Sequence, residues 1–72
     1  MQITLTAHAR QRSTRRGVPL DMIVDTIEQP NRTATGYRRR HLAYKDYGDR
    51  GTLKVVYAQE DESVTVITVI WE

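Results

Sequence analysis

The segment from Ser63 to Trp71 constrains the fold more than any other part of the chain. Its run Val64-Thr65-Val66-Ile67-Thr68-Val69-Ile70-Trp71 is apolar on both faces, which predicts a strand in the middle of a sheet. The preceding run, from Thr52 to Gln59, alternates as half-buried strands do: Leu53, Val55 and Tyr57 lie on one face, and Lys54, Val56 and Ala58 on the other. Glu60-Asp61-Glu62 lies between the two runs and predicts the tip of a hairpin.

Two helices are predicted before this hairpin. The clearer one carries Leu20, Ile23, Val24 and Ile27 at i, i+3, i+4 and i+7, which is a one-sided apolar stripe. Pro19 fits its first turn, and Pro30 stops it. An earlier helix is predicted from a Thr6 cap through Arg16, with Gly17 as its terminator and Val18 behind it.

Three further segments have strand patterns: Ile3-Thr4-Leu5, Arg32 to Thr35, and Tyr37 to Tyr47, whose alternation is poor. The length of 72 residues suits one domain, residues 1–72. We therefore predict an α+β fold with two layers, in which two N-terminal helices pack on a three- to four-stranded antiparallel sheet. The stripe of residues 20–27 is expected to cover one face of that sheet.

The composition limits the disulfides, metal sites and membrane segments that the chain can form. The chain has no cysteine and only two histidines, neither of them within a cluster of carboxylates, so we expect no disulfide, no metal site and no cofactor. No basic leader precedes an apolar stretch, and no apolar run approaches the roughly 20 residues of a membrane span. These features predict a cytoplasmic protein that does not enter a membrane.

The positive charge is concentrated in two segments. The net charge is only +2, yet residues 1–20 and 30–45 contain no acid, and arginine supplies nine of the eleven cations. The planar fork of arginine matches phosphate and carboxylate groups. This distribution favours an anionic partner such as a nucleic acid, although a GC-rich genome would also favour arginine.

The first candidate cluster is His8, Arg12 and Arg16, at i, i+4 and i+8 of the earlier helix. This spacing places the three side chains one above another. Histidine can exchange a proton near neutral pH, and arginines can stabilise charge that builds up on a phosphate. The alternative is a solvated basic helix face.

The second candidate cluster is Tyr37-Arg38-Arg39-Arg40-His41, followed by Tyr44-Lys45. Cations interleaved with aromatic rings suit a nucleic acid, because the cations meet the backbone and the rings stack on bases. On a strand, Arg38 and Arg40 would point one way and the residues between them the other. The alternative is an edge strand kept soluble by its charge.

Lys45, Tyr57 and Thr68 form a third candidate group on successive predicted strands, with Lys54 as an alternative to Lys45. Thr68 is expected on the same face as Val64, Val66 and Ile70, where its hydroxyl needs a partner. The alternatives are an ordinary β-branched strand residue for Thr68 and core packing with an exposed hydroxyl for Tyr57.

These parts together resemble a known family. His8-Ala9, Arg12 and Arg16-Gly17-Val18 match the pattern HA-x-x-R-x-x-x-R-G-[IV] of the small bacterial family called domain of unknown function 4258. Lys45, the Leu53-Lys54-Val55-Val56-Tyr57 strand and the Val66-Ile67-Thr68-Val69 strand continue the resemblance over nearly the whole chain. That family is similar in fold to RelE-type toxins, which are metal-independent ribonucleases.

The resemblance implies an RNA-cleaving activity in which a ribose 2′-OH attacks the adjacent phosphate. His8 would be the acid or base, Arg12 and Lys45 would stabilise charge, and Thr68 would orient the phosphate or a catalytic side chain. Arg16 would be either a phosphate contact or a structural residue, and Tyr57 would either contact the nucleic acid or pack in the core. Arg38 and Arg40 of the second cluster are also expected to contact the nucleic acid. An antitoxin with an acidic segment, or another protein partner, would cover the basic face.

Three hypotheses follow for the function. A ribonuclease of toxin type requires His8, Arg12 and Lys45 to converge on one phosphate. A non-catalytic nucleic-acid-binding or regulatory module requires only a basic surface and salt-sensitive binding. A small protein-interaction or inhibitor domain requires an exposed apolar edge or patch, with the last strand near Trp71 as a candidate.

Overall fold

The computed structural model describes residues 2–72. It contains two α-helices, five strands and two short 3-10 turns. In chain order these are β1 (Gln2–Leu5), α1 (Ala7–Arg15), α2 (Leu20–Glu28), β2 (Arg32–Thr35), η1 (Tyr37–Arg39), β3 (His41–Asp46), η2 (Gly48–Arg50), β4 (Thr52–Glu60) and β5 (Ser63–Trp71).

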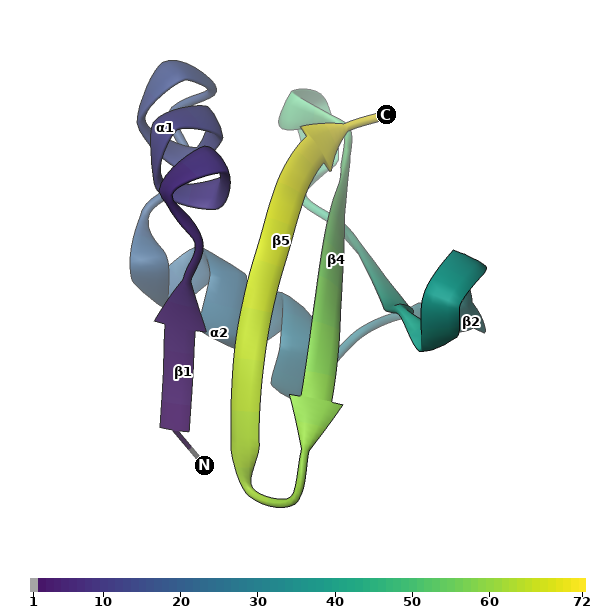
Figure 1. Ribbon diagram of the computed structural model, residues 1–72. Coiled ribbons are helices and arrows are strands. Elements are labelled where there is room, and N and C mark those ends of the chain that lie inside the picture. The colour runs from purple at the N-terminus through teal and green to yellow at the C-terminus, as the bar shows by residue number, and fades with distance from the viewer. Residues whose placement is uncertain (1) are drawn as a thin grey trace.

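The sheet has five strands in the order β1-β5-β4-β3-β2 (Figure 1). The predicted three- to four-stranded antiparallel sheet is therefore wrong, because β1 joins the sheet and pairs parallel to β5, with Ile3 opposite Val64. β5 therefore has a strand at each of its edges. Its central position was predicted correctly, whereas the partner on its second edge was missed.

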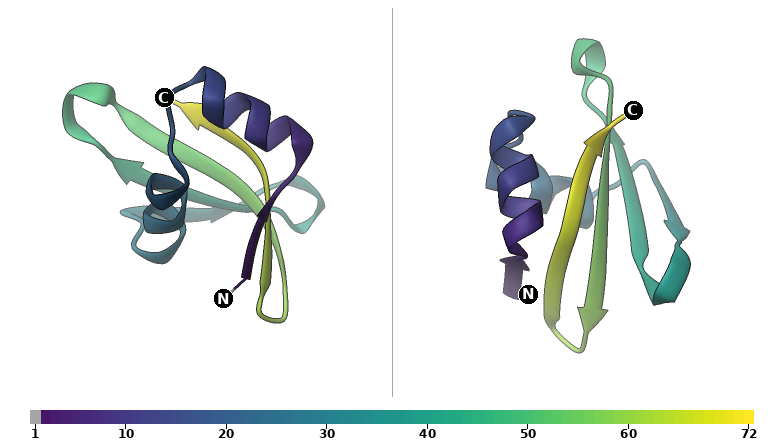
Figure 2. Two further views of the ribbon diagram at one scale, coloured as in Figure 1. Left: turned by 90° about the vertical axis from the view of Figure 1, so that its left-hand side faces the viewer. Right: turned by 45° about the horizontal axis from the view of Figure 1, so that its top comes forward.

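The two helices occupy different positions around the sheet (Figure 2). Helix α2 lies across one face, where Ile23 is fully buried against Leu53, Val55 and Val66. Helix α1 lies beside the C-terminal half of β5, beyond the point where β1 ends (Figure 1). No helix formed by residues 2–72 lies over the other face of the sheet, which we call the open face.

Helix α1 protects the edge of β5 that β1 leaves uncovered. The Thr6 side chain caps α1 by accepting from the Ala9 amide, and its hydroxyl also donates to the Ile67 carbonyl at 3.3 Å. The Arg16 guanidinium donates to the Val69 carbonyl. Unpaired strand edges are otherwise sites of unwanted association, so these bonds replace the pairing that a longer β1 would supply.

A β-bulge reorganises the middle of β5. Val56 pairs with Thr68, while the next residue, Tyr57, pairs with Val66, so that Ile67 is the extra residue. A bulge of this kind switches the side-chain alternation of one strand. Val66 and Val69 both face the core, and Thr68 therefore lies on the opposite face from Val66. The prediction that Thr68 shares a face with Val64 and Val66 is wrong for this reason.

Tyr37 to Tyr47 is not one strand. Tyr37–Arg39 forms the 3-10 turn η1, and β3 begins only at His41. Arg38 and Arg39 both adopt left-handed backbone conformations, with φ of 60° and 62°. The poor alternation of this segment in the sequence has its cause here, because the first residues form the connection between β2 and β3.

Candidate nucleic-acid interface

The open face of the sheet carries small, β-branched and basic side chains in regular register. Alternation along paired strands places one group of residues on this face: Thr4, Thr65, Thr68, Ile70, Lys54, Val56, Ala58, Leu42, Tyr44, Asp46, Arg32 and Ala34. The core holds this face in place, because side chains on the opposite face of the same strands are buried in the hydrophobic core.

Thr68 and Lys54 lie close together on the open face. Lys54 pairs with Ile70, and Thr68 is two residues from Ile70 along β5. Diagonal neighbours of this kind have Cα or Cβ atoms roughly 7–8 Å apart. The bulge at Ile67 creates this neighbourhood, because without it Thr68 would face the core.

Lys45 lies elsewhere. It is on the helix-covered face, opposite Leu53 in the register of β3 and β4. Its ammonium group is 3.4 Å from the Asp25 carboxylate and donates to the Gln29 carbonyl at 2.8 Å. The structure therefore does not bring Lys45 to the open face, and it is Lys54, the alternative to Lys45, that lies beside Thr68.

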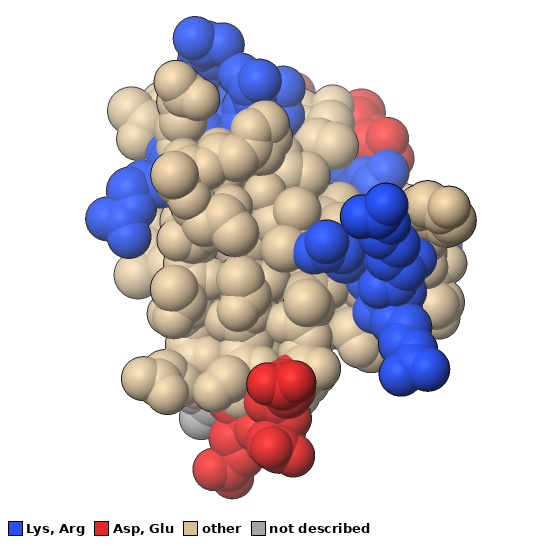
Figure 3. All heavy atoms as spheres, in the orientation of Figure 1, with Lys and Arg blue, Asp and Glu red and all other residues tan. Residues whose placement is uncertain are grey.

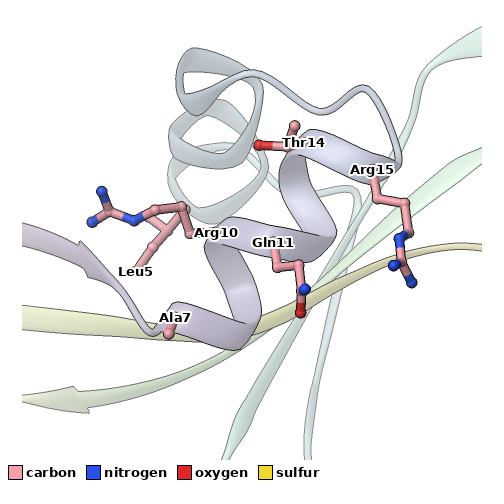
Figure 4. Close-up of a pocket in the computed structure, with 6 residues that line it drawn as sticks. All are labelled: Leu5, Ala7, Arg10, Gln11, Thr14 and Arg15. Atoms are coloured by element: carbon pink, nitrogen blue, oxygen red, sulfur yellow. The ribbon is translucent and has the colours of Figure 1, made fainter.

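The flank of α1 beside the open face carries His8 and Arg12. Successive helix residues are 100° apart, so these two and Arg15 project from one flank, while Arg10 projects from the other. Arg10 lies with Leu5 and Leu20 along one hollow on the side of α2. Figure 4 shows Arg15 pointing toward β5 and away from Arg10. His8 is exposed and Arg12 is half-buried, and both border the same face as Thr68.

Arg16 has a structural position. It is the C-terminal cap of α1, and its side chain is bound to the Val69 carbonyl. Its own carbonyl accepts from the Trp71 indole at 2.9 Å. Of the three residues predicted to stack, His8 is exposed, Arg12 is half-buried, and Arg16 fastens α1 to β5.

Turn η1 displays the second basic cluster at the end of the β2–β3 hairpin. Arg38 and Arg39 are exposed, and Tyr37 is 85% exposed. Arg38 lies over the Tyr37 ring at 5.8 Å. Arg40 follows the turn and is half-buried. Since a left-handed backbone at two successive arginines disfavours regular pairing, the turn projects these cations away from the sheet.

A cation–aromatic stack on the open face was missed by the sequence reasoning. The Arg32 guanidinium lies 3.8 Å from the centre of the Tyr44 ring, and the Lys54 ammonium lies 6.0 Å from it. Tyr44 is only 8% exposed as a result. The pairing of Arg32 with Tyr44 on β2 and β3 places these groups together, and a register for this hairpin would have predicted it.

Tyr57 lies on the helix-covered face, where it packs against the core. Its ring stacks on His41, with the ring centres 5.2 Å apart and the planes at 20°. Burial raises the pKa of the Tyr57 phenol above its ordinary value. Tyr57 is thus separated from Thr68 by the sheet itself.

Uncharged side chains cover most of the middle of the face drawn in Figure 3, although Lys54 of β4 also lies on the open face. Cations lie at the border formed by α1 and at the border formed by the β2–β3 hairpin, while acids gather at the β4–β5 turn and also lie at the opposite end of the sheet (Figure 3). We call these two borders the α1 border and the hairpin border. Within residues 2–72, no group of His, Asp and Glu side chains is placed to hold a metal ion.

Comparison with known proteins identifies the family. The family model described as domain of unknown function (DUF4258) matches residues 5–71. The chain belongs to the DUF4258 family. Comparisons with curated proteins and with solved structures return no match. The likeness of this DUF4258 domain to RelE-type toxins therefore stays an expectation from the sequence motifs.

The fold explains most of the motif by which this DUF4258 domain resembles its family. Ala9 is fully buried, Val18 is 2% exposed, and Gly17 adopts a left-handed φ of 64° between them. Arg16 fastens α1 to β5. His8 and Arg12 are the two motif positions whose side chains border the open face, which makes them the motif's candidates for function.

The described part of this DUF4258 domain, residues 2–72, includes no helix with the length and apolar character needed to cross a bilayer.

Proposed function

We propose that this protein binds single-stranded RNA across its open sheet face. The observation that carries the proposal is the arrangement of charge: a strip of largely uncharged side chains, with Lys54 beside it on β4, lies between the α1 border and the hairpin border, each rich in arginine. Phosphate contacts from arginine supply the affinity of such interfaces, and an uncharged sheet surface accommodates bases and sugars.

Several side chains favour a single strand over a duplex. Tyr37 offers an exposed ring at the hairpin border, where an unpaired base can stack. Thr65 and Thr68 place hydroxyl groups on the sheet between the borders, and hydroxyls can hydrogen-bond to ribose 2′-OH groups. These contacts need bases and sugars that are accessible, as they are in a single strand.

The test is a matched pair of arginine variants on α1. Arg12→Gln and Arg10→Gln remove the same charge from opposite flanks of one helix, and only Arg12 borders the open face. Binding of a fluorescent single-stranded RNA is measured by anisotropy over a range of salt concentrations. We expect Arg12→Gln to weaken binding about fivefold and to reduce the salt slope by about one ion, with Arg10→Gln near wild type. Equal losses in both variants would contradict binding at the open face.

Cleavage of the bound RNA is a second candidate function, favoured by the position of His8 beside Arg12 at the α1 border. In this proposal a ribose 2′-OH loses its proton to a base and its oxygen bonds to the adjacent phosphorus. The bond from phosphorus to the 5′ oxygen then breaks, and that oxygen takes up a proton. The products carry 2′,3′-cyclic phosphate and 5′-OH ends.

His8 is the proposed acid or base for this reaction, and Arg12 and Lys54 stabilise the charge on the phosphate. Lys54 takes the role first assigned to Lys45, because Lys45 is paired with Asp25 on the other face. The measurement is cleavage of end-labelled RNA in EDTA by the wild type and by His8→Ala. Intact RNA with both proteins, together with salt-dependent binding, would leave binding as the function and remove cleavage.

A further inference from the structure

A second surface lies along the outer side of α1, between the flank that carries Arg10 and the flank that carries Arg15. Two adjoining hollows, of about 780 and 430 Å³, share Leu5 and Arg10 in their walls. The larger one follows the outer side of α1 (Figure 4) and is lined by Leu5, Ala7, Arg10, Gln11, Thr14 and Arg15. The smaller one adds Ile3, Thr4 and Leu20. We call the two together the β1–α1 groove.

The free edge of β1 forms one wall of this groove. Among the strands that residues 2–72 form, β1 is outermost, and it pairs with β5. The amides of Gln2 and Thr6 donate to carbonyls of residues 62 and 66. Backbone groups alternate in direction along a strand, so the amides of Ile3 and Leu5 point outward to the free edge. Those groups can pair with another strand.

The part of the groove beside β1 is apolar, and the part along α1 is cationic. Leu20 is 57% exposed, although it begins the apolar stripe of α2. Ile3 and Leu5 are half-buried beside it. Arg10 and Arg15 lie further along α1, and none of the residues that line the two hollows is acidic. The groove therefore presents apolar surface next to an open strand edge, followed by positive charge.

We propose that the β1–α1 groove binds an extended acidic segment of another protein. One half of the segment adds to β1 as an antiparallel strand and covers Ile3, Leu5 and Leu20 with apolar side chains. The other half continues along α1, where its carboxylates meet Arg10 and Arg15. β1 and α1 each extend about 13 Å, so about eight extended residues span the groove. Thr4 and Arg15 lie where this groove adjoins the open face, on which RNA binding is proposed, and the other lining residues lie away from that face.

A synthetic peptide tests the proposal directly. The probe has an acidic half, Glu-Glu-Leu-Glu, followed by a strand-forming half, Val-Thr-Val-Thr, and it is added to the 15N-labelled full chain up to about 1 mM, a range in which weak complexes are detected. We expect shifts of the amide signals at Ile3, Leu5 and Arg10. We also expect slower hydrogen exchange of the Ile3 and Leu5 amides, because they become paired.

Charge variants provide the controls. Arg10→Glu is expected to weaken binding of the peptide about tenfold, whereas Arg39→Glu, the same change at the exposed hairpin border, leaves binding unchanged. A peptide with glutamine in place of each glutamate is expected to bind more weakly than the acidic peptide.

Three results would overturn the proposal. The first is shifts confined to the hairpin border, which would show that the peptide imitates RNA. The second is a failure of peptide binding to depend on the groove, seen either as equal losses of affinity in Arg10→Glu and Arg39→Glu or as no binding at the highest peptide concentration. The third is shifts at Ile3 and Leu5 that arise from raising the protein concentration alone, which would make a second copy of the chain the occupant.

Discussion

The lysines on the two faces of the sheet have different surroundings. On the helix-covered face, Lys45 is paired with Asp25 and with the end of α2. On the open face, Lys54 and Arg32 lie beside Tyr44, and the nearby Asp46 carboxylate accepts a hydrogen bond from the Gly48 amide. A paired lysine contributes to the fold, whereas a cluster of like charges costs stability and is suited to an anionic ligand.

The buried hydroxyls show the same division. On the helix-covered face, Thr26 is fully buried, donates to the Met22 carbonyl at 2.8 Å and lies 2.8 Å from the Tyr47 hydroxyl. On the open face, Thr65 and Thr68 are half-buried. The polar groups of the first face are satisfied within the fold, while those of the second are available to solvent or to a ligand. This comparison leads to three predictions.

The largest difference is expected in stability. Ile23→Ala removes a fully buried side chain under α2, and deletions of this kind cost about 2–5 kcal/mol because a cavity remains. Ile70→Ala makes the same change on the open face, where the side chain is half-buried, and we expect a loss of about 1 kcal/mol. Urea unfolding monitored by circular dichroism measures both. Similar losses would mean that the open face is covered in solution.

The next difference concerns binding. Lys54→Met is expected to weaken binding of single-stranded RNA about fivefold, because one phosphate contact is lost. Lys45→Met removes the same charge from the other face. It is expected to bind RNA as the wild type does, and to lose at most about 1 kcal/mol of stability because its ion pair is partly exposed. RNA affinity and urea midpoints are measured for both proteins. A stronger binding defect in Lys45→Met would reverse the assignment of the faces.

The sequence predicted the elements whose signals are local. The stripe at residues 20–27 predicted α2, and Thr6 and Gly17 marked the ends of α1. β4 and β5 and their hairpin follow the alternating pattern. In each case the signal lies within a few residues of the element, so that no knowledge of distant partners was needed.

Features that depend on distant pairing were not predictable in the same way. The parallel pairing of β1 with β5 joins segments about 60 residues apart in the chain, and nothing in Ile3-Thr4-Leu5 specifies a partner. The bulge at Ile67 depends on how β4 and β5 align, and it moved Thr68 to the other face. Once Thr68 moved, Lys54 rather than Lys45 became its neighbour. The one extra residue in the pairing of β4 with β5 thus changed which residues form the candidate site.

The smallest expected effect concerns Tyr57 on the helix-covered face. Burial raises the pKa of its phenol above the ordinary value, so the folded state holds this proton more tightly than the unfolded state does. The stabilisation from this group is complete below about pH 10, the ordinary pKa of tyrosine, and is lost as the pH rises through the folded-state pKa.

Urea midpoints measured across this alkaline range for the wild type and for Tyr57→Phe test the effect. Tyr57→Phe keeps the ring that stacks on His41 and removes the titrating hydroxyl. We expect the midpoint to fall more steeply with pH in the wild type. Tyr37→Phe is the matched control, since Tyr37 is 85% exposed and its variant should follow the wild-type curve. Identical curves for wild type and Tyr57→Phe would mean that the Tyr57 hydroxyl is solvated, and the helix-covered face would then be open to water at this end of the sheet.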